Sequence, residues 1–286
     1  MPSLIDIRRR IRSVKNTQQI TKAMKMVSAA KLRRAQDRVI ASRPYAAMLR
    51  KMLENVAAAV ATDEQAGQNA LLAQRDERRI LLVLITGDKG LAGAFNGNLI
   101  KGAQKFMAEH GGATVRLELI GRKGRDFFRK RRADISGDHV GLAAKVVYAD
   151  LAAIARKAMD LYCEEEIDAV YVLYNEFKSV VAQKLTLTKV LPVEVRERAE
   201  RVDYIFEPAA VEILNALLPR YVELEFYRAM LESAAAEHAA RMTAMEAATS
   251  NAGDMIDKLT LYMNRVRQAS ITKEIIEVVS GAAAAE

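Results

Sequence analysis

A glycine-rich stretch at residues 86–98, TGDKGLAGAFNGN, has the residue types of a phosphate-binding loop. It follows an apolar run and precedes a helical pattern, which is where phosphate loops lie. Its first glycines are spaced G-x-x-G-x-x-G, at residues 87, 90 and 93, whereas dinucleotide-binding loops use G-x-G-x-x-G. It also lacks the G-K-[ST] ending that supplies a lysine and a magnesium-binding hydroxyl. We therefore interpret the stretch as a tight turn that packs a strand against a helix.

Other residues that do chemistry are few and scattered. Cys163 is the only cysteine, which excludes an intrachain disulfide and a cysteine metal cluster. His110, His139 and His238 are far apart in the sequence, so a zinc site is not expected. No Ser/His/Asp arrangement or pair of carboxylates accompanies a pocket signal. We expect no catalytic residue, no cofactor and no metal, and the loop spacing disfavours the alternative of a dinucleotide-dependent enzyme.

Glycine divides the 286 residues into three parts. Eleven of the fourteen glycines lie between residues 87 and 141, and residues 3–66 contain none. This distribution predicts long helices at both ends and a looped α/β part between them. The expected boundaries are 1–60 for the N-terminal coiled-coil helix, 76–193 for the α/β domain and 208–286 for the C-terminal coiled-coil helix.

The middle part alternates between strand and helix patterns, which is typical of a largely parallel sheet with helices on its faces. The expected strands are 78–87, 113–121, 168–177 and 180–193, and the expected helices are 96–111, 124–132 and 148–166. The last of these strands alternates polar and apolar residues, so we expect it to be an antiparallel edge strand. A polar linker at 194–208 follows it.

The first helix is expected to begin near Ser3, an N-cap with Asp6 three residues on, in the manner of a capping box. Pro44 should kink this helix or interrupt one of its hydrogen bonds. A helix of ~55 residues is ~80 Å long, which exceeds the diameter of a compact domain. Much of it should therefore protrude. In the last helix, Pro219 and Gly253 are the two weak points.

Both long helices carry a narrow apolar stripe with the 3-4 spacing of a coiled-coil seam. The stripe of the first helix is Leu4, Ile7, Ile11 and Val14, and that of the last is Ala252, Ile256, Leu259, Met263 and Val266. Further along the first helix, the same register meets Gln18, Thr21, Lys25 and Ser28, while apolar residues move to Ile20, Met24 and Val27. Because the α/β part lies between the two helices in sequence, an antiparallel intrachain coiled coil is the simplest closure.

The end of the last helix is apolar on more sides than a two-stranded coil covers. Five apolar residues occupy several of its faces: Ile271, Ile275, Ile276, Val278 and Val279. A helix that is apolar all round must be surrounded. Each of these side chains is worth ~1.5–3 kcal/mol when buried, so leaving half of them in water would forgo roughly 5 kcal/mol. We expect a sleeve made by other chains, with packing inside the monomer as the alternative.

The net charge of +8 is unevenly distributed. Residues 1–56 hold 14 Lys/Arg against 3 Asp/Glu, whereas residues 209–286 hold 7 against 11. Three interpretations of this distribution remain open. The two ends are solvated helix faces, or they pair with each other, or the basic end binds an acidic partner. Nucleic-acid binding, which would be steeply salt-dependent, is disfavoured because the basic face has few aromatic residues and no helix-turn-helix or finger pattern. No apolar run is long enough to span a bilayer, and residues 1–10 do not suggest a signal peptide, so we expect a bacterial cytoplasm.

Taken together, these segments make the chain resemble the γ subunit of F-type ATP synthases over essentially its whole length. The resemblance is strongest in residues 7–36, 237–256 and 259–282; the last, LTLYMNRVRQASITKEIIEVVSGA, is close to a family signature. The stretches TGDKGLAGAFNGN and IGRKGRDFF match the family's middle domain. The resemblance implies an α/β protein in which long N- and C-terminal helices form an antiparallel coiled coil beside a central Rossmann-like domain.

The resemblance also implies a function, that of a rotary central stalk without bond chemistry of its own. One copy would turn inside an α3β3 ring, with the middle domain beside the ε subunit and on the membrane-embedded c-ring. Proton flow through the c-ring would then drive each catalytic β subunit through conformations of different nucleotide affinity. The chain would be peripheral to the cytoplasmic face of a bacterial inner membrane. A basic coiled coil that binds nucleic acid or acts as a scaffold is the alternative.

Partner contacts follow from the resemblance by position. Arg267 and Gln268 match residues that hydrogen-bond a loop of one β subunit, where the arginine fork suits a carboxylate. Met24 and Lys25 match the neck of the shaft, level with an acidic segment of the β subunits. The residues expected in an apolar bearing at the tip are Ile275, Ile276, Val278 and Val279, and those expected at the foot near the c-ring are Tyr204, Phe206 and Glu207.

Overall fold

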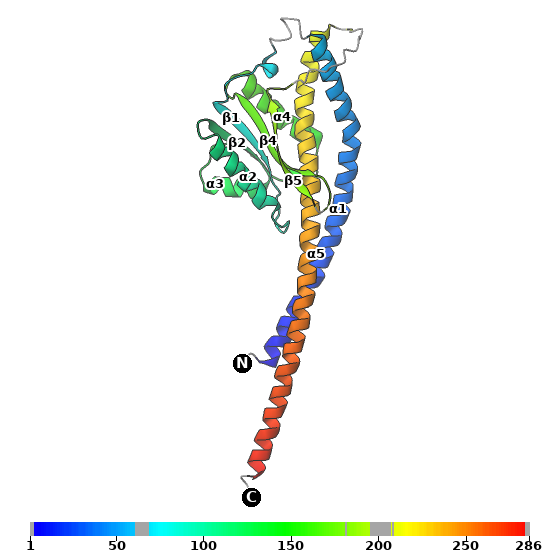
Figure 1. The fold of residues 1–286 in the computed structure, drawn as a ribbon, viewed down its shortest axis with the longest axis vertical. Helices are drawn as coiled ribbons and strands as arrows, with labels where there is room; N and C mark the ends of the chain where they lie inside the picture. The colour runs from blue at the N-terminus through cyan, green and yellow to red at the C-terminus, as the bar shows by residue number, and fades with distance from the viewer. Residues whose placement is uncertain (1–2, 61–68, 181, 195–206, 208, 284–286) are drawn as a thin grey trace. The chain divides into compact units, whose positions relative to one another are not determined.

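A computed structural model describes residues 3–60, 69–180, 182–194, 207 and 209–283. The chain divides into two units, one made of Met1–Ser28 with Met242–Glu286 and the other of Ala29–Arg241. Two long helices, α1 (Leu4–Ala59) and α5 (Ala210–Ala283), contribute residues to both units (Figure 1). Each unit is described by itself below.

The start of α1 has the predicted capping box. The Asp6 amide donates to Ser3 Oγ at 3.3 Å, and the Ser3 amide donates to Asp6 Oδ2 at 3.4 Å. Two of the four unpaired amides at the helix start are thereby satisfied. Both long helices continue through their prolines, because Pro44 lies inside α1 and Pro219 inside α5. Gly253 does not interrupt α5 either.

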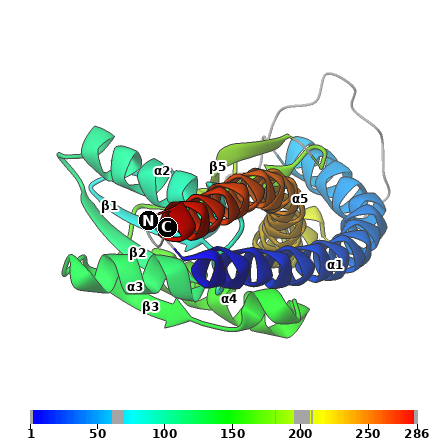
Figure 2. The same cartoon turned by 90° about the horizontal axis from the view of Figure 1, so that it is seen from below.

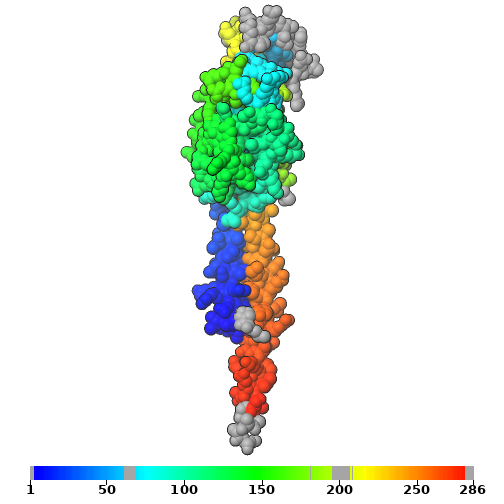
Figure 3. Space-filling model, turned by 90° about the vertical axis from the view of Figure 1, so that its left-hand side faces the viewer, coloured from blue at the N-terminus to red at the C-terminus, as the bar shows by residue number. Residues whose placement is uncertain are grey.

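The first unit is an antiparallel pair of helices. Thr21 of α1 lies opposite Thr249 of α5, and four residues further along α1 Lys25 forms an ion pair with Glu246. Residue numbers therefore rise along one helix as they fall along the other. In this register the first turns of α1 lie beside Leu259 and Tyr262, so the rest of α5 extends past the beginning of α1 (Figures 1 and 3).

The contact seam between these two helices follows the predicted register, also where its residues are polar. Ile7, Thr21 and Ser28 of α1 are buried, as are Met245 and Ala252 of α5. A Cβ added at Gly253 would lie 3.3 Å from Gln18 Nε2, so the missing side chain allows the helices to approach closely. The coil therefore does not change register where its apolar stripe ends.

The second unit contains a five-stranded sheet in the order β3-β2-β1-β4-β5. Its strands are β1 (Arg79–Ile85), β2 (Thr114–Ile120), β3 (Ile135–His139), β4 (Ala169–Phe177) and β5 (Gln183–Leu191). All neighbouring strands are parallel except β4 and β5, which confirms the predicted antiparallel edge. Strand β3 was not predicted, because ISGDH lacks apolar alternation and all five residues are only half-buried.

Helices cover both faces of this sheet. They are α2 (Phe95–Glu109), α3 (Arg122–Lys130) and α4 (Tyr148–Cys163), with 3-10 turns η2 (Ala70–Leu72) and η3 (Leu142–Ala144). Alternate residues of β1 point to opposite faces, as the twofold period of a strand requires. Ile80, Leu82 and Leu84 pack with α2 and α3. The ribbons of these two helices lie beside the sheet in Figures 1 and 2. Leu81, Val83 and Ile85 pack with α4 and with the parts of α1 and α5 that belong to this unit.

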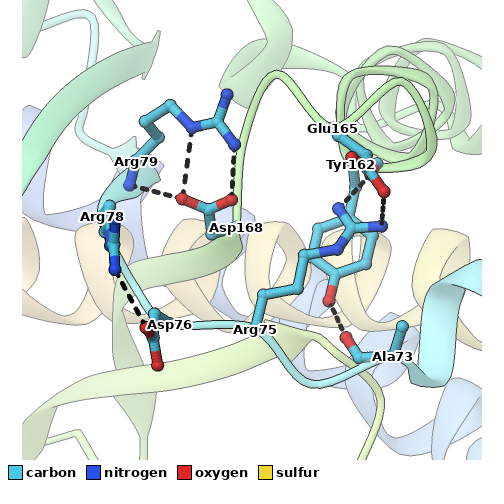
Figure 4. Close-up of polar contacts among 8 residues, drawn as sticks. All are labelled: Ala73, Arg75, Asp76, Arg78, Arg79, Tyr162, Glu165 and Asp168. Atoms are coloured by element: carbon cyan, nitrogen blue, oxygen red, sulfur yellow. Dashed lines mark hydrogen bonds and ion pairs between the residues drawn. The ribbon is translucent and has the colours of Figure 1, made fainter.

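Hydrogen bonds and ion pairs of charged side chains connect the segments at the start of β1 and β4 (Figure 4). The Arg79 guanidinium donates to both carboxylate oxygens of Asp168, with distances of 3.2 and 2.8 Å, and the Arg79 amide donates to the same carboxylate at 2.8 Å. This contact joins the start of β1 to the residue before β4. Arg75 donates to the Tyr162 carbonyl at 2.8 Å and lies 4.8 Å from the centre of its ring. These ionic groups are therefore structural.

Candidate partner-contact surfaces

The carboxyl end of β1 is where a nucleotide would be sought. Sheet order reverses at this strand, since β2 lies on one side of it and β4 on the other. In open α/β sheets, ligands bind in the crevice at such a switch point. The glycine-rich residues 86–98 follow β1, so their surroundings decide whether the crevice is open.

A carboxylate of the chain itself occupies the anion position of the loop. Asp88 Oδ1 accepts the amide of Arg122 at 3.0 Å, and Asp88 Oδ2 accepts the amide of Gly141 at 3.0 Å. Arg122 is the first residue of α3, so Asp88 caps the helix end that would otherwise attract a phosphate.

Helix α5 fills the rest of the crevice. A Cβ added at Gly87 would lie 2.7 Å from Glu237 Oε1, so this glycine allows the carboxylate to pack against the loop. Arg241 Nη2 donates to Glu237 Oε1 at 2.5 Å and reaches the Gly90 carbonyl at 3.4 Å. The Glu237 and Arg241 residues are only 6% and 9% exposed. These contacts confirm the interpretation of residues 86–98 as a packing turn.

The described residues offer no metal-binding group and no membrane-spanning helix. Within them, His, Cys, Asp and Glu side chains form no group of three that would hold a metal ion. None of the helices built from those residues has the length and apolar character needed to cross a membrane.

The predicted neck residues lie in the helix pair of the first unit. Met24 is half-buried, and the Lys25 ammonium pairs with Glu246 of α5. The apolar residues that left the seam face outward, because Ile20 and Val27 are exposed and Met26 is 63% exposed. Met26 was not among the predicted contacts, although its position off the seam register could have indicated it. Contiguous exposed apolar residues mark interaction sites, so this band is a candidate contact surface.

Arg267 and Gln268 are exposed on α5, directly after the seam residue Val266. Among the described residues, no carboxylate forms an ion pair with Arg267. The Gln268 side chain is likewise exposed, and its backbone carbonyl accepts the Thr272 hydroxyl at 2.9 Å. Both side chains are available to a partner, while the backbone beneath them is fixed by the helix.

The apolar tip has no cover from any described residue. Its members are between 49% and 71% exposed: Ile271, Ile275, Ile276, Val278 and Val279. All residues from 271 to 280 are exposed, although α5 stays helical to Ala283. The alternative of packing inside the monomer does not apply to these side chains.

The predicted foot residues are only partly described. Glu207 is exposed, just before the start of α5. Tyr204 and Phe206 lie outside the described residues. The structure therefore brings together Arg267, Gln268 and the tip on one end of α5, and it leaves the foot contact a prediction.

Proteins that are similar in sequence to this chain are ATP synthase gamma chains. The family described as ATP synthase matches residues 3–285. An ATP synthase gamma chain of Solibacter usitatus (strain Ellin6076) is 76% identical over 286 residues, which cover all of both chains. One from Anaeromyxobacter sp. (strain Fw109-5) is 51% identical over 289 residues, covering 99% of each chain.

Solved structures agree in fold. A chain from the central stalk and c-ring structure of Tetrahymena thermophila mitochondrial ATP synthase has a TM-score of 0.62 and 28% identity, covering 80% of this chain and 99% of that one. A chain from the Euglena gracilis mitochondrial ATP synthase has a TM-score of 0.69, covering 98% of this chain and 94% of that one. At 18% identity, the second supports the fold alone.

The filled crevice, the paired helices and the uncovered tip define a stalk-type subunit that works through contacts with partner chains. The chain belongs to the ATP synthase gamma-chain family. Membership confirms the predicted central-stalk role and the predicted non-catalytic character of the subunit. It gives no support to the nucleic-acid or scaffold alternative.

Proposed function

We propose that the end of α5 turns inside a ring of three α and three β subunits, and that this rotation couples proton flow to ATP synthesis or hydrolysis. The uncovered tip carries the proposal, because five apolar side chains that are 49–71% exposed require a sleeve. Burying the exposed fractions is worth roughly 5 kcal/mol in total. Apolar contact is not directional, so such a sleeve holds the tip at every angle of rotation.

Arg267 and Gln268 supply the contact that depends on angle. They precede Ile275 by about two helical turns, which is ~12 Å along the axis. Hydrogen bonds from a guanidinium to a carboxylate are directional and charge-assisted. A shaft that makes them with one β subunit at a time interacts unequally with the three, and only such a differential interaction shifts their equilibria.

Two further surfaces of the chain, the band of exposed apolar residues at the neck and the foot, would contact the remaining partners. Ile20, Met26 and Val27 face outward beside Lys25, where the β subunits would surround the coil. The foot, including Tyr204, Phe206 and Glu207, would contact the ε subunit and the c-ring. The similar Tetrahymena chain comes from a structure of a central stalk with its c-ring, which supports this placement. One copy per complex, peripheral to the cytoplasmic face of a bacterial inner membrane, completes the proposal.

Co-expression of the chain with the α, β and ε subunits of its complex tests the assembly. We expect one copy of this chain to co-purify with three copies each of α and β, and with ε. The double change Ile275→Ser with Ile276→Ser should weaken the complex, while Ile275→Val with Ile276→Val should not. Recovery of the unchanged chain as a free monomer would contradict the proposal.

A further inference from the structure

The second unit contains a half-open pocket where α1 and α5 meet η3 and the loop after it. Its volume is about 160 Å³. The α1 wall carries Lys31, Arg34 and Arg38, whose spacing places them on one face of the helix. Leu231, Ala234 and His238 form the α5 wall, with the same spacing. Alanines and a valine supply the rest: Ala35, Ala143, Ala144 and Val146.

The charge of this pocket is uncompensated. No Asp or Glu lines it. Lys31, Arg34 and Arg38 form no ion pair with any residue for which the structure gives a position, whereas elsewhere in the same unit Arg156 and Arg241 pair with glutamates at 2.6 and 2.5 Å. Three exposed cations therefore line one recess that has no carboxylate in its lining, and this arrangement favours an anion there.

The one histidine of the pocket, His238, has a lowered pKa. Burial, together with the positive charges of Arg241 and Lys31, lowers the pKa of His238 to about 4. Its imidazole is therefore neutral near pH 7, and its Nδ1 lies 3.5 Å from Arg241 Nη1. The charged groups that face this imidazole are Arg241 on its own helix and Lys31 on α1, with Arg34 and Arg38 lining the same pocket.

We propose that the pocket binds a small multivalent oxyanion of the phosphate class, held by Lys31, Arg34 and Arg38. Guanidinium groups match the geometry of such oxyanions and bind them through charge-assisted hydrogen bonds. Drug-sized ligands occupy pockets of ~300–1,000 Å³, so a recess of this size takes inorganic phosphate or pyrophosphate rather than a whole nucleotide. The site is separate from the glycine-rich loop, whose anion position Asp88 occupies, and it does not rest on the proposed rotary function.

The three histidines of the chain provide the measurement. With histidine isotopically labelled in the full-length chain, side-chain NMR signals of His110, His139 and His238 are followed while sodium phosphate or sodium pyrophosphate is added, against sodium chloride at equal ionic strength. Near neutral pH, where phosphate is largely divalent, a bound anion changes the electrostatic field at the His238 imidazole, so the His238 signals should shift in a saturable way. The signals of the other two histidines serve as internal references.

Single substitutions test which residues hold the anion. Arg34→Gln and Arg38→Gln should each weaken phosphate binding about tenfold, the effect of losing a charge-assisted hydrogen bond. Arg33→Gln is the matched control, because it removes the same charge from an exposed neighbour that does not line the pocket. Circular dichroism verifies that each variant is folded. An absent response, an equal response to chloride, or an equal loss in Arg33→Gln would overturn the proposal.

Discussion

The hydroxyl oxygens of Thr21 and Thr249 lie 2.7 Å apart across the seam of the first unit. Each is also within hydrogen-bond distance of a carbonyl of its own helix, that of Gln18 at 3.0 Å and that of Met245 at 2.7 Å. A polar pair at one seam position fixes the register of a coiled coil at some cost in stability. This pair stands where the apolar stripe of α1 ends, so it keeps the two helices aligned there.

A double-mutant cycle at this pair should show coupling. We expect Thr21→Val and Thr249→Val each to destabilise the helix pair by about 1 kcal/mol, because each leaves the other hydroxyl without its cross-helix partner. The double change should cost less than the sum, by about 0.5–1.5 kcal/mol, since valine restores an apolar seam. Thermal unfolding followed by circular dichroism measures all four proteins. Thr17→Val is the control, because this exposed hydroxyl donates to the Ser13 carbonyl of its own helix and does not lie across the seam. Strict additivity would contradict the coupling.

A second prediction concerns the buried Glu118 at the centre of β2, which is 1% exposed. His139 Nε2 lies 2.7 Å from one of its oxygens, and Lys157 Nζ donates to the other at 2.9 Å. Burial raises the pKa of Glu118, but the hydrogen bonds from His139 and Lys157 outweigh burial and hold the pKa below its usual value. The carboxylate therefore ties the edge strand β3 and helix α4 to β2.

The pH dependence follows from the sign of this shift. A carboxyl whose pKa is lowered on folding stabilises the protein above its unfolded pKa of 4.5, and the contribution is lost as the pH falls through the folded value. Glu118→Gln should destabilise this unit by about 3 kcal/mol at pH 7, with a smaller difference below about pH 4.5. Hydrogen exchange of the β2 and β3 amides, followed at both pH values, measures this loss of stability.

The control for Glu118 is Glu109→Gln. This exposed carboxylate pairs with Lys105 of its own helix, at 3.6 Å, so the change should stay within about 0.5 kcal/mol. A loss in Glu118→Gln that is independent of pH would show that packing, and not the charge, holds the strands together.

A third prediction compares two glycines that share a positive φ, although their ψ angles differ. Gly121 has φ +98°, and a Cβ there would lie 2.0 Å from the Thr86 carbonyl oxygen. Gly141 has φ +94°, and a Cβ there would meet nothing within 4 Å. We expect Gly141→Ala to cost about 1 kcal/mol from backbone strain alone, whereas Gly121→Ala should leave little folded protein. Soluble yield and melting temperature distinguish them, and equal effects would contradict the close approach at Gly121.

Local patterns in the sequence were enough to predict most of the elements. The apolar run 80–85 indicated a buried strand, and β1 occupies Arg79–Ile85. The spacing of Ile271 to Val279 indicated a helix end in need of cover, and these residues are exposed. β3 was missed because the pairing of ISGDH with β2 provides a stability that its own residues do not indicate.

Contacts between distant parts of the chain were not predictable. Gly87 and Glu237 are 150 residues apart, so the spacing of glycines argued against a nucleotide but did not show that α5 fills the crevice. The partners of Glu118 come from β3 and α4 and have no common motif. Such pairings depend on the packed arrangement of elements, which a single sequence does not contain.

A fourth prediction concerns Arg267, whose guanidinium is exposed. Arg267→Ala should slow ATP hydrolysis by the assembled complex about tenfold, the effect of losing a charge-assisted hydrogen bond to a β subunit. The helicity of the isolated chain should not change, because alanine favours helix. Arg265→Ala is the control, since it removes an equally exposed arginine from a different face of α5. Unchanged turnover in Arg267→Ala, or an equal loss in the control, would show that the β-subunit assignment is wrong.

The most direct test of the central claim is the accessibility of the tip. Cys163 is the only cysteine, so Cys163→Ala followed by Ile276→Cys gives a single thiol at the tip. Cys163→Ala with Lys105→Cys gives a control thiol at an exposed position of α2. The rate of maleimide labelling is measured in the isolated chain and in the assembled complex. The proposal predicts at least a tenfold slower reaction at position 276 in the complex, with position 105 unchanged. An equal rate at position 276 in both states would show that no sleeve surrounds the tip.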